Sequence, residues 1–134
     1  MCFYSNTNET KIASKPIRVY KLLEKNNEAP AMFYKYYRGL NTPEHPETSY
    51  VYYKNNNLYE YGGGWLHALK HYERKYSNSH IHRMVMMFIP EGCKYHNAGI
   101  GPGNLTDCTN HIISKALYWP KNWFDYLRWF IKSL

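Results

Sequence analysis

The sequence predicts a single α+β domain over residues 1–134, with a mixed or antiparallel sheet of about five strands, a central helix and a C-terminal helix. Three observations predict this class. The apolar run Met84–Ile89 is closed by Pro90 and Gly92, which is typical of a buried strand that enters a tight turn. Residues 17–24 alternate as a strand does, and two later segments place apolar residues at helical spacing.

The N-terminal part of the chain is predicted to consist mainly of strands. Residues 1–14 are polar, so we expect them to be loosely ordered. Residues 17–24, IRVYKLLE, follow a proline and alternate, which predicts the first strand. Residues 31–40 fit a strand or a short helix, and we favour a strand that leads into a turn. Residues 41–48 contain two prolines and are predicted to form a loop.

The middle of the chain is predicted to form a hairpin and then a helix. Residues 49–53 and 58–61 are rich in β-prone residues and are separated by an asparagine-rich turn, so they fit a hairpin. Three glycines at 62–64 fit a hinge. Residues 65–76, WLHALKHYERKY, carry apolar residues at three- and four-residue spacings, which predicts the central helix.

The C-terminal part begins with the strand of residues 83–89 and the turn that follows it. Residues 96–104, HNAGIGPGN, are glycine-rich and are predicted to form a loop, whose functional interpretation is a lid over a ligand. Residues 112–119 are the last strand candidate, and Pro120 ends them.

Residues 122–134 are predicted to form the C-terminal helix. Asn122 suits the N-cap, and Asp125 lies where a carboxylate favours the positive end of the helix dipole. The apolar surface is wide, which fits deep packing or contact with a second subunit, so we expect self-association through this helix. Its apolar face comprises Trp123, Leu127, Phe130, Ile131 and Leu134.

Composition describes a folded, basic and tyrosine-rich protein. Hydrophobic residues make up 44% of the chain and charged residues 20%, which excludes a disordered polymer. The net charge of +7 suits an anionic partner, such as a nucleotide-like small molecule, nucleic acid or an acidic protein face. The basic residues are scattered, so nucleic acid is the less favoured of these partners.

Cysteine usage and hydropathy predict a cytoplasmic protein that does not enter a membrane. No apolar stretch approaches the roughly 18 residues that span a bilayer, and the N-terminus lacks a secretory signal pattern. Cys2, Cys93 and Cys108 are odd in number and widely spaced, which fits reduced thiols.

Several segments resemble a family of small proteins from phages and their bacterial hosts, many of them in Bacteroidota. They are the Met1-Cys2 start, IRVYKLL at 17–23, GGWLHAL at 63–69 and MVMMFIPEGCKYH at 84–96. This chain has Glu91 where the IP-x-G-x-KY element of the family usually has lysine, and its Trp-rich C-terminal helix is an extension. Because the family has no settled function, the resemblance implies a phage-type origin and a bacterial host cell rather than an activity.

Two further segments are similar to parts of ADP-ribosyltransferase-like folds. Tyr37-Arg38-Gly39 resembles their aromatic-Arg-Gly near an early strand, and Pro90-Glu91-Gly92 resembles their late turn. This resemblance implies an NAD-using enzyme in which Arg38 and His67 hold NAD. The chain lacks the Glu-x-Glu that closes the pattern, which favours a degenerate version that only binds.

Six residues near the ends of predicted elements are candidates for ligand binding. Aromatic faces stack on bases, and arginine or lysine pairs with phosphate. The alternative is that the tryptophan belongs to the core and that the cations are solvated. The candidates are Arg38, Trp65, His67, Lys70, Lys94 and Tyr95.

No catalytic, metal or cofactor motif is complete in the sequence. His67 and His71 are four residues apart on the predicted helix, but no third ligand is marked, so we expect no metal site. Neither Cys93 nor Cys108 has local support as a nucleophile. The glycines of residues 99–103 lack the Lys-Ser/Thr of a P-loop, and we expect no cofactor.

The leading hypothesis is a non-enzymatic, phage-type binding protein that counteracts bacterial host defence. It would sequester a nucleotide-derived signal as a sponge, or block a defence protein directly. This hypothesis rests on the resemblance and not on a motif. The alternatives are an ADP-ribosyltransferase-like enzyme that uses NAD, and a nucleic-acid-binding protein that uses the Tyr-rich strands.

Overall fold

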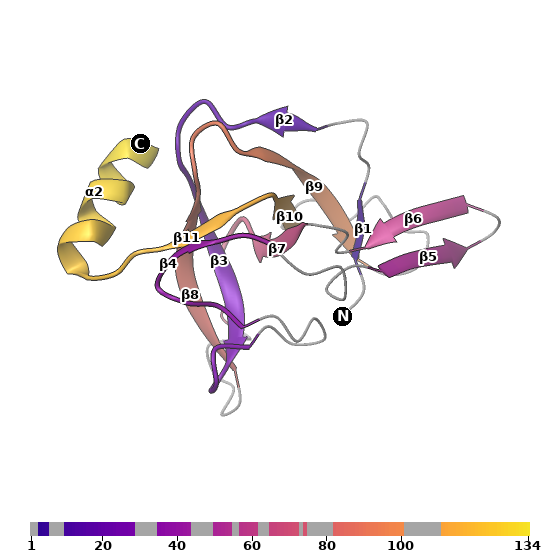
Figure 1. The fold of residues 1–134 in the computed structure, drawn as a ribbon, viewed down its shortest axis with the longest axis horizontal. Helices are drawn as coiled ribbons and strands as arrows, with labels where there is room; N and C mark the ends of the chain where they lie inside the picture. Colours follow the sequence, from indigo (N-terminus) through magenta and orange to yellow (C-terminus); the bar gives the residue numbers. More distant parts are fainter. Residues whose placement is uncertain are drawn as a thin grey trace.

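An antiparallel sheet of nine strands forms the body of the protein in the computed structural model (Figure 1). The structure describes residues 3–5, 10–28, 35–43, 50–54, 57–61, 65–72, 74, 82–100 and 111–134. The sheet contains β1 (Phe3–Ser5), β2 (Lys11–Ile12), β3 (Ile17–Glu24), β4 (Gly39–Asn41), β7 (Leu66–Leu69), β8 (His82–Ile89), β9 (Lys94–Ile100), β10 (His111–Ser114) and β11 (Leu117–Trp119). A hairpin of β5 (Tyr50–Lys54) and β6 (Asn57–Tyr61) and the C-terminal helix α2 (Trp123–Ser133) are also described.

The predicted α+β class is confirmed, and the strands in the described part of the chain pair antiparallel. The hairpin expected from residues 49–53 and 58–61 is also confirmed. The prediction of about five strands is wrong. β2 has two residues, and β4 and β11 have three each, which is too short to show a period along the sequence.

The nine-stranded sheet is curled and not flat. Its strands follow the order β1-β9-β10-β7-β3-β8-β11-β4, and β2 pairs separately with β9. β10 and β11 therefore lie four positions apart, although only residues 115–116 connect them. Three residue steps reach about 10 Å, whereas four strand spacings of a flat sheet cover about 19 Å. The sheet must roll to bring β10 and β11 together, which encloses one of its faces.

The enclosed face carries the hydrophobic core. β3 and β8 pair over their full lengths of eight residues, with Val19 opposite Met87 and Lys21 opposite Val85. Alternate side chains of both strands point to the inside, which confirms the two strands that the sequence predicts most clearly. The side chains that are completely buried in this core include Val19, Leu23, Met87, Ile89 and Leu117.

The turn between β8 and β9 has the geometry expected from its Pro-x-Gly sequence. The Cys93 N–H donates to the carbonyl oxygen of Pro90 (3.1 Å), which closes a four-residue turn. Gly92 has a φ of 81°, a conformation that glycine adopts without a steric penalty. Lys94 and Tyr95 therefore begin β9 beside the end of β8.

β7 corrects the predicted central helix. Residues 66–69 form a strand between β10 and β3. Leu66, Ala68 and Leu69 are all buried, and a strand that is covered on both faces shows no clean alternation of apolar and polar residues. The same four apolar-rich residues therefore fit a helical period equally well. Residues 73 and 75–76 of the predicted helix lie outside the described part of the chain.

Two other predicted segments differ from the structure. Residues 96–100, expected in a glycine-rich loop, belong to β9, because their backbone pairs with β10 and β1. Residues 112–119 form two strands instead of one, since the chain must turn at Lys115 to pass from β10 to β11. The predicted hinge at residues 62–64 and the end of the glycine-rich loop, residues 101–104, lie outside the described residues. The segment 1–14 contributes β1 and β2.

α2 confirms the predicted C-terminal helix and its cap. The side-chain oxygen of Asn122 accepts a hydrogen bond from the Asp125 N–H (2.9 Å). No helix in the described ranges is long and apolar enough to span a bilayer.

Replacing Asn122 with alanine is expected to lower the free energy of unfolding by about 1 kcal/mol, because the Asp125 N–H loses its acceptor. Urea denaturation measures this difference. Asn122→Ser keeps a capping oxygen and should stay within about 0.5 kcal/mol of the wild type. A serine variant as unstable as the alanine variant would contradict a capping role.

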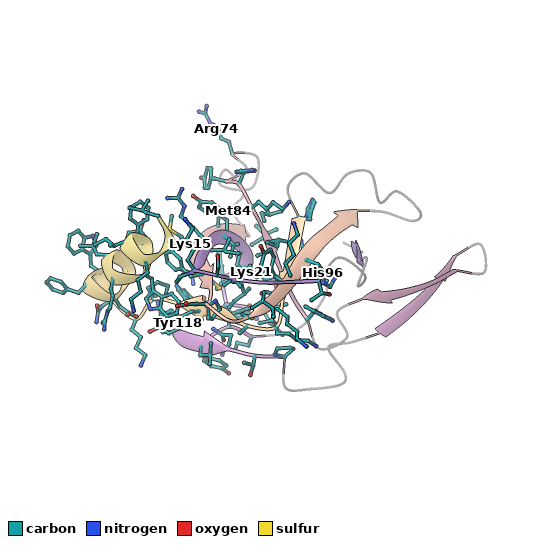
Figure 2. The ribbon with its side chains drawn as sticks, turned by 90° about the horizontal axis from the view of Figure 1, so that it is seen from above. Lys15, Lys21, Arg74, Met84, His96 and Tyr118 are labelled. Carbon is teal, nitrogen blue, oxygen red and sulfur yellow. The ribbon has the colours of Figure 1, made fainter. Side chains whose placement is uncertain are left out.

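α2 packs against the outer face of the curled sheet through an aromatic side. Trp129 stacks on Tyr118 with 4.2 Å between the ring centroids, and it lies 5.9 Å from the ring of Phe88. The guanidinium of Arg18 lies 5.1 Å from the centre of the Phe130 ring. Figure 2 shows Tyr118 beside the helix. Most of the predicted apolar face instead remains exposed, at Trp123, Ile131 and Leu134.

Candidate functional site

A cleft of about 550 Å³ gathers basic and tyrosine side chains near the C-terminal end of α2. We call it the tyrosine cleft. Ser133 and Leu134 of the C-terminal segment contribute to its wall. Its basic residues are Lys11, Arg18, Lys70 and His71, and its tyrosines are Tyr20, Tyr72 and Tyr95.

Strand pairing explains how distant residues meet in the tyrosine cleft. Lys11 of β2 pairs with Tyr95 of β9. Tyr20 of β3 pairs with Leu69, the last residue of β7, so the residues after β7 emerge beside β3. Tyr72 then meets Tyr20 edge to face, with 5.8 Å between the ring centroids.

The charge of the tyrosine cleft favours an anionic ligand. Three of its lining residues, Lys11, Arg18 and Lys70, are basic, and none of the lining residues that the structure describes is Asp or Glu. Cations that share a cleft without a carboxylate produce a positive potential there. The tyrosine rings supply flat, partly apolar surfaces on which a base can stack.

A second cleft, of about 460 Å³, lies at the N-terminal end of α2, and we call it the arginine cleft. The guanidinium of Arg38 lies 4.3 Å from the centre of the Trp119 ring, and that of Arg83 lies 5.7 Å from the same ring. Arg38 donates to the carbonyl oxygen of Pro120 (2.8 Å), which fixes the side chain on the indole. Lys121, Trp123 and Tyr126 also line this cleft.

His67 lies in a buried cluster with Lys21 and His111. The Nζ of Lys21 donates to the carbonyl oxygen of His67 (2.5 Å), and Nε2 of His67 lies 3.0 Å from Nδ1 of His111. One histidine must therefore donate to the other, which requires at least one neutral ring. Burial, with a further contribution from Lys21, lowers the pKa of His67 well below its usual value. This cluster belongs to the folded core and does not line either cleft.

Trp65 also lies in the interior. Its ring meets that of His96 edge to face at 4.5 Å, and the Nζ of Lys115 lies 4.3 Å from the Trp65 ring centre. His96 is buried on the part of the sheet away from α2 (Figure 2). Burial lowers the pKa of His96 to about 4, and the charge of Lys115 acts in the same direction. Within the described residues, neither ring nitrogen of His96 has a hydrogen-bond partner.

In the part of the chain that the structure describes, two of the six residues that the sequence marks as candidates line the same cleft. Lys70 and Tyr95 share the tyrosine cleft. Arg38 lines the arginine cleft, and Lys94 is exposed at the start of β9. His67 and Trp65 lie in the interior. For Trp65 this agrees with the alternative interpretation, in which the tryptophan belongs to the core. β3, β8 and β11 separate Arg38, beside β4, from His67 in β7, although the NAD hypothesis needs both on one ligand.

Sequence analysis gave no ligand-binding role to four residues that line the clefts. Arg18 and Tyr20 were assigned only as part of a strand, and Arg83 only as the start of another. Trp119 was assigned to the last strand and given no role. The alternation of residues 17–24 already places Arg18 and Tyr20 on the face opposite the core, and that was the available signal.

Metal and thiol chemistry find little support in the described part of the chain. It contains no group of three or more His, Cys, Asp or Glu side chains that could hold a metal ion. His67 lies in a strand, so its predicted helical pairing with His71 does not occur. Cys93 is a free thiol whose pKa is raised by burial, and a neutral thiol is a weak nucleophile.

Comparison with known proteins gives no match to a protein-family model, to a curated protein or to a solved structure. We therefore infer the function from the chemistry of the clefts.

Proposed function

We propose that this protein binds a nucleotide-type anion in the tyrosine cleft and holds it without chemical turnover. The observation that carries the proposal is the meeting of three basic side chains and three tyrosines in one cleft, where none of the described lining residues is Asp or Glu. In the phage setting that the sequence resemblance implies, such binding would withdraw a nucleotide-derived signal from a host defence system.

The residue types of the tyrosine cleft match the two parts of a nucleotide. Lysine and arginine form charge-assisted hydrogen bonds with phosphate, and an aromatic face stacks on a base. The edge-to-face contact between Tyr20 and Tyr72 holds these rings at an angle, and Tyr72 is 51% exposed, so solvent and a planar ligand can reach it. Stacking is worth about 1–3 kcal/mol per base, and it adds to the affinity that the phosphate contacts supply.

Lys70→Gln is expected to weaken binding of adenosine monophosphate about tenfold, because one cation leaves the cleft while the side chain keeps much of its length. Isothermal titration calorimetry measures the affinity, and chromatography of the recovered ligand tests for turnover. Lys25→Gln removes the same charge from an exposed turn outside the cleft and should change the affinity less than twofold. Equal weakening in both variants would indicate net charge alone, and a converted ligand would contradict the non-enzymatic part of the proposal.

A second candidate function is binding to protein, either a defence protein or a second copy of this chain. The observation that favours it is the outer face of α2, where Trp123 is 66% exposed and Phe124 is 78% exposed. Exposed tryptophan and phenylalanine on one helix are typical of contact surfaces. Sedimentation velocity distinguishes the self-association expected through this helix from a monomer that offers the same face to another protein.

A further inference from the structure

The tyrosine cleft and the arginine cleft meet on the outer face of β3 and β8. Tyr20 of β3 lines the tyrosine cleft, and Met86 of β8 lines the arginine cleft. These two residues are direct partners in the β3–β8 register. Directly opposed side chains of an antiparallel pair project from the same face about 5 Å apart. The two clefts therefore adjoin at Tyr20 and Met86 on the outer face of the sheet. The arginine cleft also extends beyond that face, because Arg83 is opposite the buried Leu23 and Trp119 lies in the core cluster.

α2 connects the same two clefts. Its first turn provides Trp123 and Tyr126 to the arginine cleft, and the end of the chain provides Ser133 and Leu134 to the tyrosine cleft. Between these ends the helix is held on the sheet by the stacking of Trp129 on Tyr118. One rigid helix thus fixes the separation of the clefts.

The arginine cleft repeats the chemistry of the tyrosine cleft with different residues. Arg38 and Arg83 both lie against Trp119, so two like charges share one indole. Among the described residues that line the cleft, Lys121 adds a further basic side chain and none is Asp or Glu. Arginine presents a planar set of donors that pairs with phosphate through two hydrogen bonds at once. Trp123, which is largely exposed, offers an indole face for a second base.

We propose that the two clefts form one bipartite site for a ligand with two nucleotide units joined by a phosphodiester. This inference rests on the proposed function and names its ligand class. One unit occupies the tyrosine cleft, and the other occupies the arginine cleft. Because the units are linked, binding of the first raises the effective concentration of the second, which increases affinity beyond that of either unit alone.

The test compares adenosine monophosphate with the 5′-phosphorylated dinucleotide pApA by titration calorimetry. We expect pApA to bind at least tenfold more tightly than the mononucleotide, with one dinucleotide per chain. In Arg83→Gln the ratio of the two affinities should fall to near one, because the second unit loses a phosphate partner. Lys25→Gln, outside both clefts, should preserve the ratio.

The outcomes separate this inference from the proposed function. If the mononucleotide binds and pApA binds no more tightly, the bipartite site is refuted while nucleotide binding survives. A tenfold preference for pApA that Arg83→Gln leaves intact also overturns the role of the arginine cleft. If neither ligand binds, the proposed function itself fails. The melting temperature of Arg83→Gln shows whether a loss of preference accompanies a loss of folding.

Discussion

Replacing Lys21 with methionine is expected to stabilise the protein by about 2 kcal/mol at neutral pH, because the change removes a buried charge while it keeps the side-chain volume. Lys21 is only 4% exposed and projects into the enclosed core from β3. Its ammonium group donates to the His67 carbonyl and lies 5.2 Å from the centre of the Tyr36 ring. Neither neighbour is an anion, so the charge of Lys21 is not neutralised by them.

The same residue is expected to make stability depend on pH. Burial lowers the pKa of Lys21 from its usual 10.5 to about 7. Between these values the unfolded chain binds a proton that the folded protein does not, so stability rises with pH by up to about 1.4 kcal/mol per unit. Below about pH 7 both states are protonated, and this contribution is constant. His67, whose pKa is well below its usual value, stays neutral throughout the rising window.

Urea denaturation between about pH 7 and pH 9 measures both effects. The range ends at pH 9 because Cys93, whose usual pKa is 9.0, ionises in the unfolded chain near that pH and adds its own pH dependence. Wild-type stability should rise through this window, and Lys21→Met should remove most of the rise. Lys15→Met, at an exposed position, should keep the wild-type slope and change stability by less than about 0.5 kcal/mol. A destabilised Lys21→Met protein with the wild-type slope would show that the amine is solvated.

The predictions from sequence were accurate where the structure of a segment is determined by residues within that segment. The run of residues 83–89 and its Pro-x-Gly turn are local features, and so are the cap and first turn of α2. β7 depends instead on β3 and β10, and 41 residues separate it from each of them in the chain. Residues 66–69 form a strand because they pair with the backbones of β3 and β10. No pattern within residues 66–69 indicates this pairing.

The candidate site was likewise predictable from sequence only where local features mark its residues. Lys70 and Tyr95 are candidates because they lie near the ends of predicted elements, and both line the tyrosine cleft. Trp65 was selected for its ring, but its contact with His96 arises from the pairing of distant strands. The arginine cleft needs Arg38, Arg83 and Trp119 from three separate segments, so it becomes visible only after the sheet has curled.

Asp125→Ala is expected to lower the free energy of unfolding by about 3 kcal/mol, because the loss of a buried carboxylate leaves its partners unsatisfied. The Asp125 side chain accepts hydrogen bonds from the Tyr118 hydroxyl (2.6 Å) and the Lys121 N–H (2.9 Å). It therefore ties the start of α2 to β11. Burial alone would raise the pKa of Asp125, but these hydrogen bonds and the charge of Arg128 lower it below its usual value of 3.8. The stabilisation is thus present above about pH 4 and is lost as the pH falls through the lowered pKa.

Arg128 provides the matched control. Replacing it removes the ion pair with Asp125 and keeps the hydrogen bonds that Asp125 accepts, so the two contributions can be measured separately. Arg128 lies 3.4 Å from the Asp125 carboxylate, but its side chain is 65% exposed. Solvent weakens such a pair, so Arg128→Gln should cost less than about 1 kcal/mol in urea denaturation. Tyr118→Phe, which removes one hydrogen bond and keeps the stack on Trp129, should have an intermediate effect. If Arg128→Gln costs as much as Asp125→Ala, the exposed ion pair and not the buried network holds α2 in place. The helix would then be sensitive to salt, and the fixed separation of the two clefts would be lost at high ionic strength.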